Sequence, residues 1–160
     1  MEYRQGAIGA MTDEYEKALY ELKVVLETVS YDAFFTPMDS NDTNCKSIRN
    51  IIFHVASAGY SYCNYIRKHF GNEFTNPDIK IDSVQDAILE LDIMFQYNVA
   101  TYKDKWHLTE SEISKNTIVT SWAIYELEGI IEHSIVHILR HRLQIQKIIQ
   151  IIKKHETKRL

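Results

Sequence analysis

Three histidines recur every fourth residue within the isoleucine-rich stretch IIEHSIVHILRHRLQI of this 160-residue chain. They are His133, His137 and His141. An imidazole ring inside an apolar core needs a hydrogen-bond or metal partner, because burial removes its solvating water. Side chains four residues apart lie on the same face of a helix, so two such rings can bind one metal ion.

A helical wheel separates the three histidines. With His133 at zero and about 100° per residue, the apolar arc of this helix spans about 60° to 140°. The arc is formed by Leu127, Ile130, Ile138, Ile145, Ile148 and Ile152. On this wheel His141 falls at about 80°, inside the arc, and His137 at about 40°, on its edge. We therefore expect His137 and His141 to face the interior, with His133 farther out.

Two histidines are too few for a catalytic zinc site, which usually has three protein ligands and one open position. His54, in the stretch SIRNIIFHVASAGYSY, is the candidate for the third ligand. It lies at the edge of an apolar helix face, and the small Ala58 one turn later leaves space beside it. Each histidine alone is equally explained as a hydrogen-bonded imidazole at the edge of the core. The remaining histidines fall at segment ends or in the tail: His69, His107 and His155.

Other side chains near the histidines were weighed as parts of a site. Glu128 and Glu132 point away from the apolar arc, which predicts solvated or interfacial carboxylates. Gln144, one turn beyond His141, is placed either to orient a ligand or to face solvent. Five aromatic residues could line a pocket or simply fill the core: Tyr60, Tyr62, Tyr65, Trp122 and Tyr125. The chain has no HExxH, no Glu-x-x-His pair for a di-iron centre, and no glycine-rich phosphate-binding motif.

Long helices must position these residues. Proline occurs twice and glycine five times, and such sparse helix-breaking residues favour long helices. Ser83, followed by Asp86, is a typical helix N-cap. Periodicity predicts four helices and no strands, with the helices at Thr12–Val29, Lys46–Phe70, Ser83–Trp106 and Ser121–Lys154.

These four helices predict an all-α fold in a single domain over residues 1–160, built as a four-helix bundle. The connections of about a dozen residues are longer than is usual in bundles, so they leave room for a crossover. Simple up-and-down topology therefore does not follow.

Composition narrows the classes of partner. The formal net charge is −4 and the isoelectric point is near 6.0, which argues against a nucleic-acid-binding protein. Cys45 and Cys63 form no CxxC pair, and free thiols are typical of a reducing compartment. No stretch has the apolar length of a membrane span or a signal peptide. We expect a soluble cytoplasmic protein.

The stretches SIRNIIFHVA and EHSIVHILRHRLQI together resemble the DinB/YfiT-like superfamily. Its pattern is a histidine in an apolar run of the second helix, followed by H-x-x-x-H-x-x-Q in the fourth, here His137 to Gln144. The resemblance implies a bundle of up-down-down-up topology that binds a divalent metal, often zinc or nickel. Carried over, the ligands are His54, His137 and His141. A register that uses His133 with His137 stays open.

The resemblance leaves two classes of function. Characterised relatives include transferases and isomerases that act with low-molecular-weight thiols. A metal on three neutral imidazoles lowers the pKa of a bound thiol or water, which would support S-transfer to a small electrophile or hydrolysis. No general acid or base is evident beside the histidines. The alternative is a non-catalytic metal-binding or interaction protein of the stress response.

A homodimer is expected as well, since members of this superfamily are commonly dimers. The last helix has a second apolar sector, opposite the core arc, formed by Ile135, Val136, Leu139 and Leu143. An exposed apolar patch often marks an interface. The alternative is that the stretch YDAFFTPM, with Phe34 and Phe35, covers this sector within one chain.

Overall fold

A computed structural model describes residues 3–157 of the chain. This part contains six α-helices, two 3-10 turns and one two-stranded sheet, and the all-α prediction holds at this coarse level. The helices are α1 Gly6–Glu27, α2 Tyr31–Phe35, α3 Ile48–His69, α4 Val84–Tyr102, α5 Glu110–Lys115 and α6 Leu127–Thr157. The turns and strands are η1 Thr43–Cys45, η2 Lys103–Lys105, β1 Thr117–Val119 and β2 Ile124–Glu126.

The first helix begins earlier than the expected Thr12. It begins at Gly6, whose φ of 71° is strained for residues with a side chain. A Cβ at this glycine would lie 2.1 Å from the main-chain oxygen of Trp106, so the start of α1 packs tightly against the chain after η2. Ile8 is fully buried there. This packing explains why a glycine-rich stretch without a strong N-cap is helical.

The last helix begins later than the expected Ser121, and the expectation of no strands was wrong for the described residues. β1 pairs antiparallel with β2, with Ile118 opposite Tyr125. The turn between them is closed by Thr120, whose Oγ1 accepts from Ala123 N–H at 2.9 Å. Strands so short and rich in β-branched residues carry too few positions to reveal a period of two.

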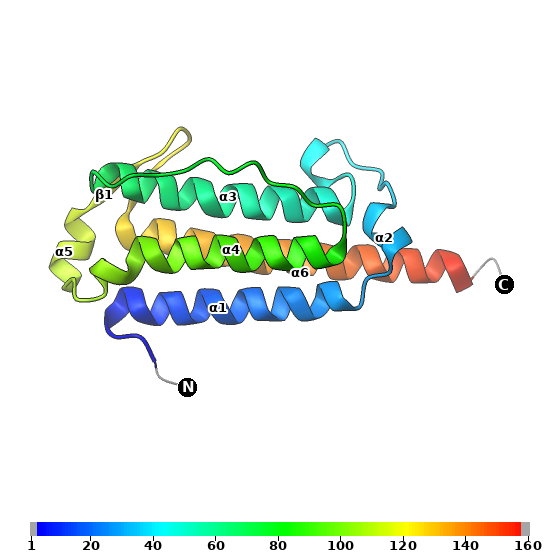
Figure 1. Ribbon diagram of the computed structural model, residues 1–160, viewed down its shortest axis with the longest axis horizontal. Helices are drawn as coiled ribbons and strands as arrows, with labels where there is room; N and C mark the ends of the chain where they lie inside the picture. Colours follow the sequence, from blue (N-terminus) through cyan, green and yellow to red (C-terminus); the bar gives the residue numbers. More distant parts are fainter. Residues whose placement is uncertain (1–2, 158–160) are drawn as a thin grey trace.

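Four long helices run side by side along the molecule (Figure 1). α1 packs against α4 and α6, and α3 packs against the same two helices. In Figure 1, α1 and α6 run in one direction, and α3 and α4 run in the other. Two consecutive parallel helices need a long connection, and segment 70–83 supplies it by passing back along α3 (Figure 1).

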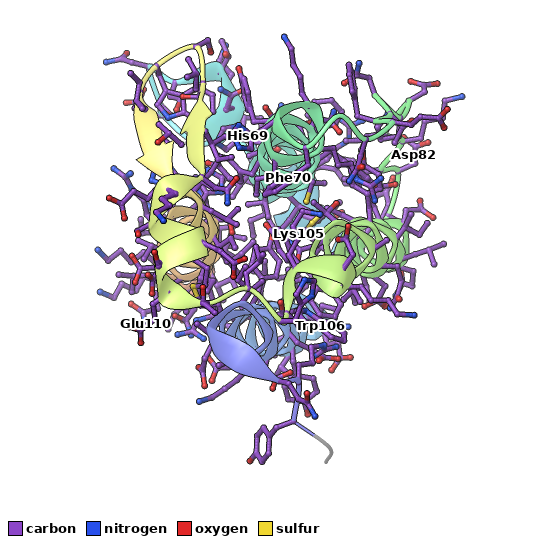
Figure 2. All side chains as sticks on the ribbon, turned by 90° about the vertical axis from the view of Figure 1, so that its left-hand side faces the viewer. His69, Phe70, Asp82, Lys105, Trp106 and Glu110 are labelled. Carbon is purple, nitrogen blue, oxygen red and sulfur yellow. The ribbon has the colours of Figure 1, made fainter. Side chains whose placement is uncertain are left out.

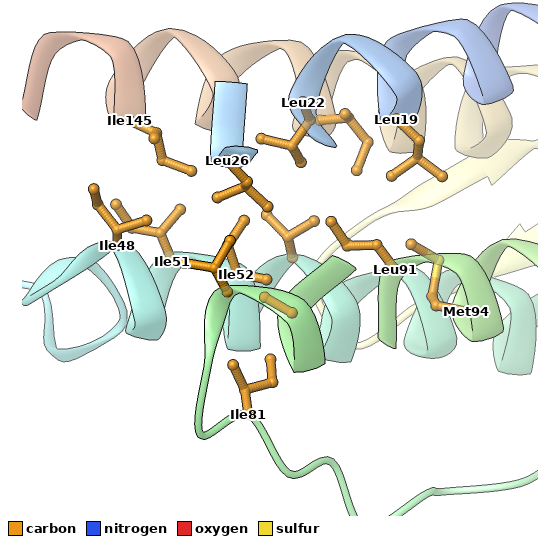
Figure 3. Packing of buried hydrophobic residues seen from close by; sticks show 14 of the residues in the cluster. Leu19, Leu22, Leu26, Ile48, Ile51, Ile52, Ile81, Leu91, Met94 and Ile145 are labelled. Atoms are coloured by element: carbon orange, nitrogen blue, oxygen red, sulfur yellow. The ribbon is translucent and has the colours of Figure 1, made fainter. Parts of the chain in front are cut away.

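A continuous core lies between the four helices (Figure 3). Its central cluster contains buried aliphatic residues from every long helix, including Leu19, Leu22 and Leu26, Ile48, Ile51 and Ile52, Leu91 and Met94, and Ile145. A second cluster lies towards the hairpin and includes Ile8, Ile66, Tyr102, Ile118 and Ile130. As expected, the N-cap of α4 is Ser83, whose Oγ accepts from Asp86 N–H at 3.0 Å.

The end of the molecule that carries α5 is closed by a buried lysine (Figure 2). Lys105 is 3% exposed, and its Nζ lies 4.6 Å from the ring centroid of Phe70. The same Nζ pairs with the Asp104 carboxylate at 2.6 Å. A buried ammonium needs such partners, so this contact links η2 to the end of α3.

Two helical glycines provide a matched test of this packing. At Gly59 in α3 an added Cβ would lie 2.5 Å from Met94 Sδ, whereas at Gly129 in α6 the nearest atom is 3.7 Å away. We expect Gly59→Ala to lower the free energy of unfolding by about 1–3 kcal/mol through overpacking. Gly129→Ala should raise it by up to about 1 kcal/mol, because alanine favours helix. Urea unfolding measures both, and equal effects would contradict the close α3–α4 approach.

Candidate metal centre

The structure brings the three predicted ligands together. α3 carries His54, and α6 carries His137 and His141. The Nε2 atom of His137 lies 3.0 Å from Nε2 of His54 and 3.2 Å from Nε2 of His141. One ring nitrogen from each of the three residues lies within 4.8 Å of the others. The sequence expectation that these rings converge is therefore met in the described part of the chain.

The spacing of these nitrogens fits a single metal ion. Zinc–imidazole bonds are about 2.0–2.1 Å long, which in a tetrahedral site places two nitrogens on one ion about 3.3–3.4 Å apart. The two Nε2–Nε2 separations of 3.0 and 3.2 Å are close to this spacing and slightly shorter. Three neutral imidazoles are also a donor set that zinc and nickel accept. The residues present therefore fit the metal that the family resemblance implies.

The neighbouring core residues explain how the rings are aimed. On α3, Ile51, Ile52 and Val55 are fully buried, which leaves His54 half-buried at the edge of that face. On α6, Ile138 and Ile145 are likewise buried. Both helices turn these apolar faces into the same cluster, so the histidines beside them meet at the seam between α3 and α6.

Gln144 contacts one of the rings, which matches the first of its two alternatives from the sequence. Nδ1 of His141 lies 2.9 Å from Gln144 Oε1. An amide oxygen only accepts hydrogen bonds, so His141 Nδ1 carries the proton and donates it. The Nε2 atom of His141 then presents its lone pair to the other two rings. This is the support that ligating histidines usually have.

Burial keeps the three imidazoles neutral. His141 is only 7% exposed, and His54 and His137 are half-buried. Burial lowers the pKa of His54 and of His141. Burial, followed by repulsion from the charged forms of His141 and His54, lowers the pKa of His137 to about 3. Neutral imidazole is the form that binds metal, so the site is in its ligating state at neutral pH.

A cavity of about 480 Å³ opens at the three histidines. Beside them and Gln144 it is lined by residues that the sequence did not assign to a site: Asp42, Cys45, Arg140, Leu143 and Lys147. Residues 137, 140, 144 and 147 are three or four apart on α6, so the helical wheel held a signal for the basic pair. Asp42 and Cys45 come from a connection whose path periodicity does not predict.

The turn that carries Asp42 is held by its own hydrogen bonds. Asp42 Oδ1 accepts from Asn44 N–H at 2.9 Å, and its Oδ2 accepts from the Cys45 thiol at 3.4 Å. These two hydrogen bonds lower the pKa of Asp42. Burial raises the pKa of Cys45. Asp42 is therefore a weak base, and Cys45 is a protonated thiol at neutral pH.

His133 lies outside the converging nitrogens. It is exposed, and its ring contacts those of Tyr62 and Tyr125, each with centroids 5.5 Å apart. The register that pairs His133 with His137 is thus not the one in this structure. The glutamates expected to be solvated and the histidines expected to be peripheral are all exposed: Glu128, Glu132, His69, His107 and His155.

The five aromatic residues considered as pocket residues lie outside the lining of the histidine cavity. Tyr62 is buried, and its ring contacts His137 at 5.8 Å between centroids. Tyr60 donates to Glu90 at 2.9 Å. Trp122, expected on the last helix, lies instead in the hairpin turn and donates to Tyr125 Oη at 3.0 Å.

Comparison with known proteins found no match to a family model, to a curated protein or to a solved structure. The likeness to the DinB/YfiT-like superfamily therefore rests on the two histidine motifs and remains a proposal. Within residues 3–157 no helix combines the length and the apolar character needed to cross a membrane.

The first prediction for this centre concerns the ligands themselves. His141→Ala should weaken zinc binding by about 100-fold or more, because it removes one of three ligands. His133→Ala, the matched control on the same helix, should leave zinc affinity unchanged. Competition with a chromophoric chelator, on protein without a histidine tag, measures both. Equal losses would place His133 among the ligands.

The second prediction for this centre concerns the hydrogen bond between His141 and Gln144. Gln144→Ala removes the acceptor that orients His141, and losses of this kind weaken metal binding by about 10–100-fold. Gln146→Ala changes an exposed glutamine on the same helix and is the control. The same chelator competition applies. Unchanged affinity in Gln144→Ala would show that the hydrogen bond does not support the site.

Proposed function

We propose that the chain is a DinB-like protein that holds one divalent metal ion, zinc or nickel, on His54, His137 and His141. We further propose that it acts as a metal-dependent enzyme of the thiol S-transferase type on a small electrophile. The observation that carries the proposal is the convergence of three neutral imidazoles at the wall of a cavity of about 480 Å³. Cavities of this size are typical of small-molecule sites.

The helix layout supports the fold half of this proposal. We assign the described helices to a four-helix bundle of up-down-down-up topology. The directions of the four long helices in Figure 1 and the long connection 70–83 are what this topology requires. The helix directions thus add support that the two histidine motifs alone do not give.

A divalent ion held here would lower the pKa of a thiol or of water and so supply a nucleophile near neutral pH. The three imidazoles add no negative charge to the centre, and Gln144 keeps the His141 lone pair directed towards it. Cys45 is kept protonated by burial, so the protein's own thiol is a poor nucleophile. This favours a thiol that enters from solution.

Among residues 3–157, no strong base lines the cavity. Asp42 is the only carboxylate that these residues place in its lining, and it already accepts hydrogen bonds from Asn44 and Cys45. The proton of an incoming thiol therefore passes to solvent or buffer. Hydrolysis would need a positioned base more than thiol transfer does, because water is far less acidic than a thiol. The cavity thus favours S-transfer over hydrolysis.

A thiol-alkylation assay tests this function. Zinc- or nickel-loaded protein should accelerate the reaction of 2-mercaptoethanol or cysteine with monobromobimane by about tenfold or more over metal-free protein. His141→Ala should abolish the acceleration. The ester 4-nitrophenyl acetate serves as the hydrolysis arm. If the metal is bound but neither reaction is accelerated, the non-catalytic metal-binding alternative is correct.

We also propose a homodimer formed through α6. Val136, Leu139 and Leu143 are 59%, 37% and 52% exposed on this helix. Ile135, expected in the same sector, instead packs against both core clusters, so the sector is narrower than the wheel suggested. Phe34 is fully buried in the core. Because Val136, Leu139 and Leu143 are exposed, these residues argue against the alternative that the α2 segment shields them.

Leu139→Glu tests the dimer. A charge at this position should weaken self-association at least about tenfold, because one buried leucine is worth roughly 1.5–3 kcal/mol at an interface. Leu89→Glu places the same charge at a residue 59% exposed on α4 and is the control. Sedimentation velocity at low micromolar concentration reads both. A wild-type chain that remains at 18.8 kDa would refute the dimer.

A further inference from the structure

The histidine cavity carries an excess of positive charge in a chain that is negative overall. In the described part of the chain two basic side chains line it, Arg140 and Lys147, against one carboxylate, that of Asp42. The chain as a whole has a formal charge of −4. With the three histidines neutral, the cavity still has one more positive than negative group. Its charge is thus opposite in sign to that of the protein around it.

The two basic groups are available to a ligand. Among residues 3–157, neither Arg140 nor Lys147 takes part in an ion pair or a side-chain hydrogen bond. On the same helix Arg142, which points away from the cavity, is paired with Glu21. The carboxylate of Asp42 meanwhile accepts from Asn44 and Cys45. The carboxylate in the cavity lining therefore accepts hydrogen bonds within its own turn, whereas the two cations have no such partner among residues 3–157.

The positions of these cations relative to the histidines suggest how a ligand would lie. Residues 137, 140, 144 and 147 follow one stripe of α6, so Arg140 and Lys147 lie about one turn either side of Gln144. A small molecule with its reacting atom at the three Nε2 atoms would have its other end within this stripe. Guanidinium binds carboxylate, sulfonate and phosphate through paired hydrogen bonds.

We infer that this cavity binds a small molecule with a negatively charged tail, held by Arg140 and Lys147 while its reacting end meets the three histidines. The inference rests on the proposed function and specifies its substrate class: a thiol or electrophile that carries a carboxylate, sulfonate or phosphate. The cavity of about 480 Å³ has room for such a molecule.

Cys45 provides a reporter of the charge in the cavity. Its thiol lines the same cavity and is partly exposed, whereas Cys63 is fully buried. Two methanethiosulfonate reagents react with this thiol by the same chemical step. One has an anionic sulfonatoethyl tail and the other has a cationic trimethylammonioethyl tail. The thiolate attacks the sulfenyl sulfur, a protein disulfide forms, the sulfur–sulfonyl bond breaks, and methanesulfinate leaves with the bonding pair.

The quantity measured is the ratio of the two rate constants, anionic over cationic reagent, divided by the same ratio for free 2-mercaptoethanol. Both reagents meet the same thiolate, so a change in the pKa of Cys45 cancels. Metal-free wild-type protein at low salt should give a normalised ratio above one. Arg140→Gln combined with Lys147→Gln should lower it about fivefold or more, and added salt should reduce the difference.

Lys153→Gln combined with Lys154→Gln is the matched control, because it removes two charges from the same helix outside the cavity lining. It should leave the ratio close to the wild-type value, and circular dichroism checks that all variants are folded. A ratio of one or below in wild type, or an equal ratio in the Arg140 and Lys147 variant, would overturn the inference.

Zinc separates this inference from the proposed function. If zinc binds and changes the Cys45 rates while the charge preference is absent, the metal site stands and the anionic substrate class is wrong. If the charge preference is present and zinc has no effect, the anion-binding cavity stands and the metal site is wrong. Each result therefore supports or refutes one proposal independently of the other.

Discussion

The packing of α3 against α6 is the constraint on which the centre depends. His54 is separated from His137 by 83 residues in sequence, and only the register between these two helices brings the two rings together. That register is held by fully buried isoleucines that belong to one core cluster on both helices. A shift of one residue would rotate His54 by about 100° and remove it from the pair on α6. The site is thus a consequence of core packing.

The arrangement of lone pairs on the three rings favours a metal cation over protons at this position. The proton of His141 is on Nδ1, where Gln144 accepts it, so its Nε2 can only accept. A single proton on His137 Nε2 would have to serve both neighbours, at 3.0 and 3.2 Å. One cation satisfies all three lone pairs at once. Burial, which lowers the pKa of each ring, discourages the alternative of charging them.

Periodicity made the helical half of the site predictable. The i, i+4 spacing of His137 and His141 follows from the geometry of a single helix, so the wheel placed both on the inner face, whereas it left open whether Gln144 orients a ligand or faces solvent. His54 could be predicted only from its apolar neighbours and the family pattern. Periodicity could not predict the positions of the 42–45 turn and the hairpin, because these positions depend on tertiary contacts between distant segments. The late start of α6 at Leu127 has the same origin.

Three sides of α6 have different surroundings, which accounts for its mixture of apolar, histidine and basic residues. One side is buried in the core through Ile138 and Ile145, the next carries the candidate ligands and the basic pair, and a third exposes Val136 and Leu139. Leu143 belongs to the last two, since it lines the histidine cavity and is 52% exposed. A second copy bound at the exposed sector would therefore stand at the edge of the cavity. Leu143 would therefore belong both to the proposed dimer interface and to the lining of the proposed metal site.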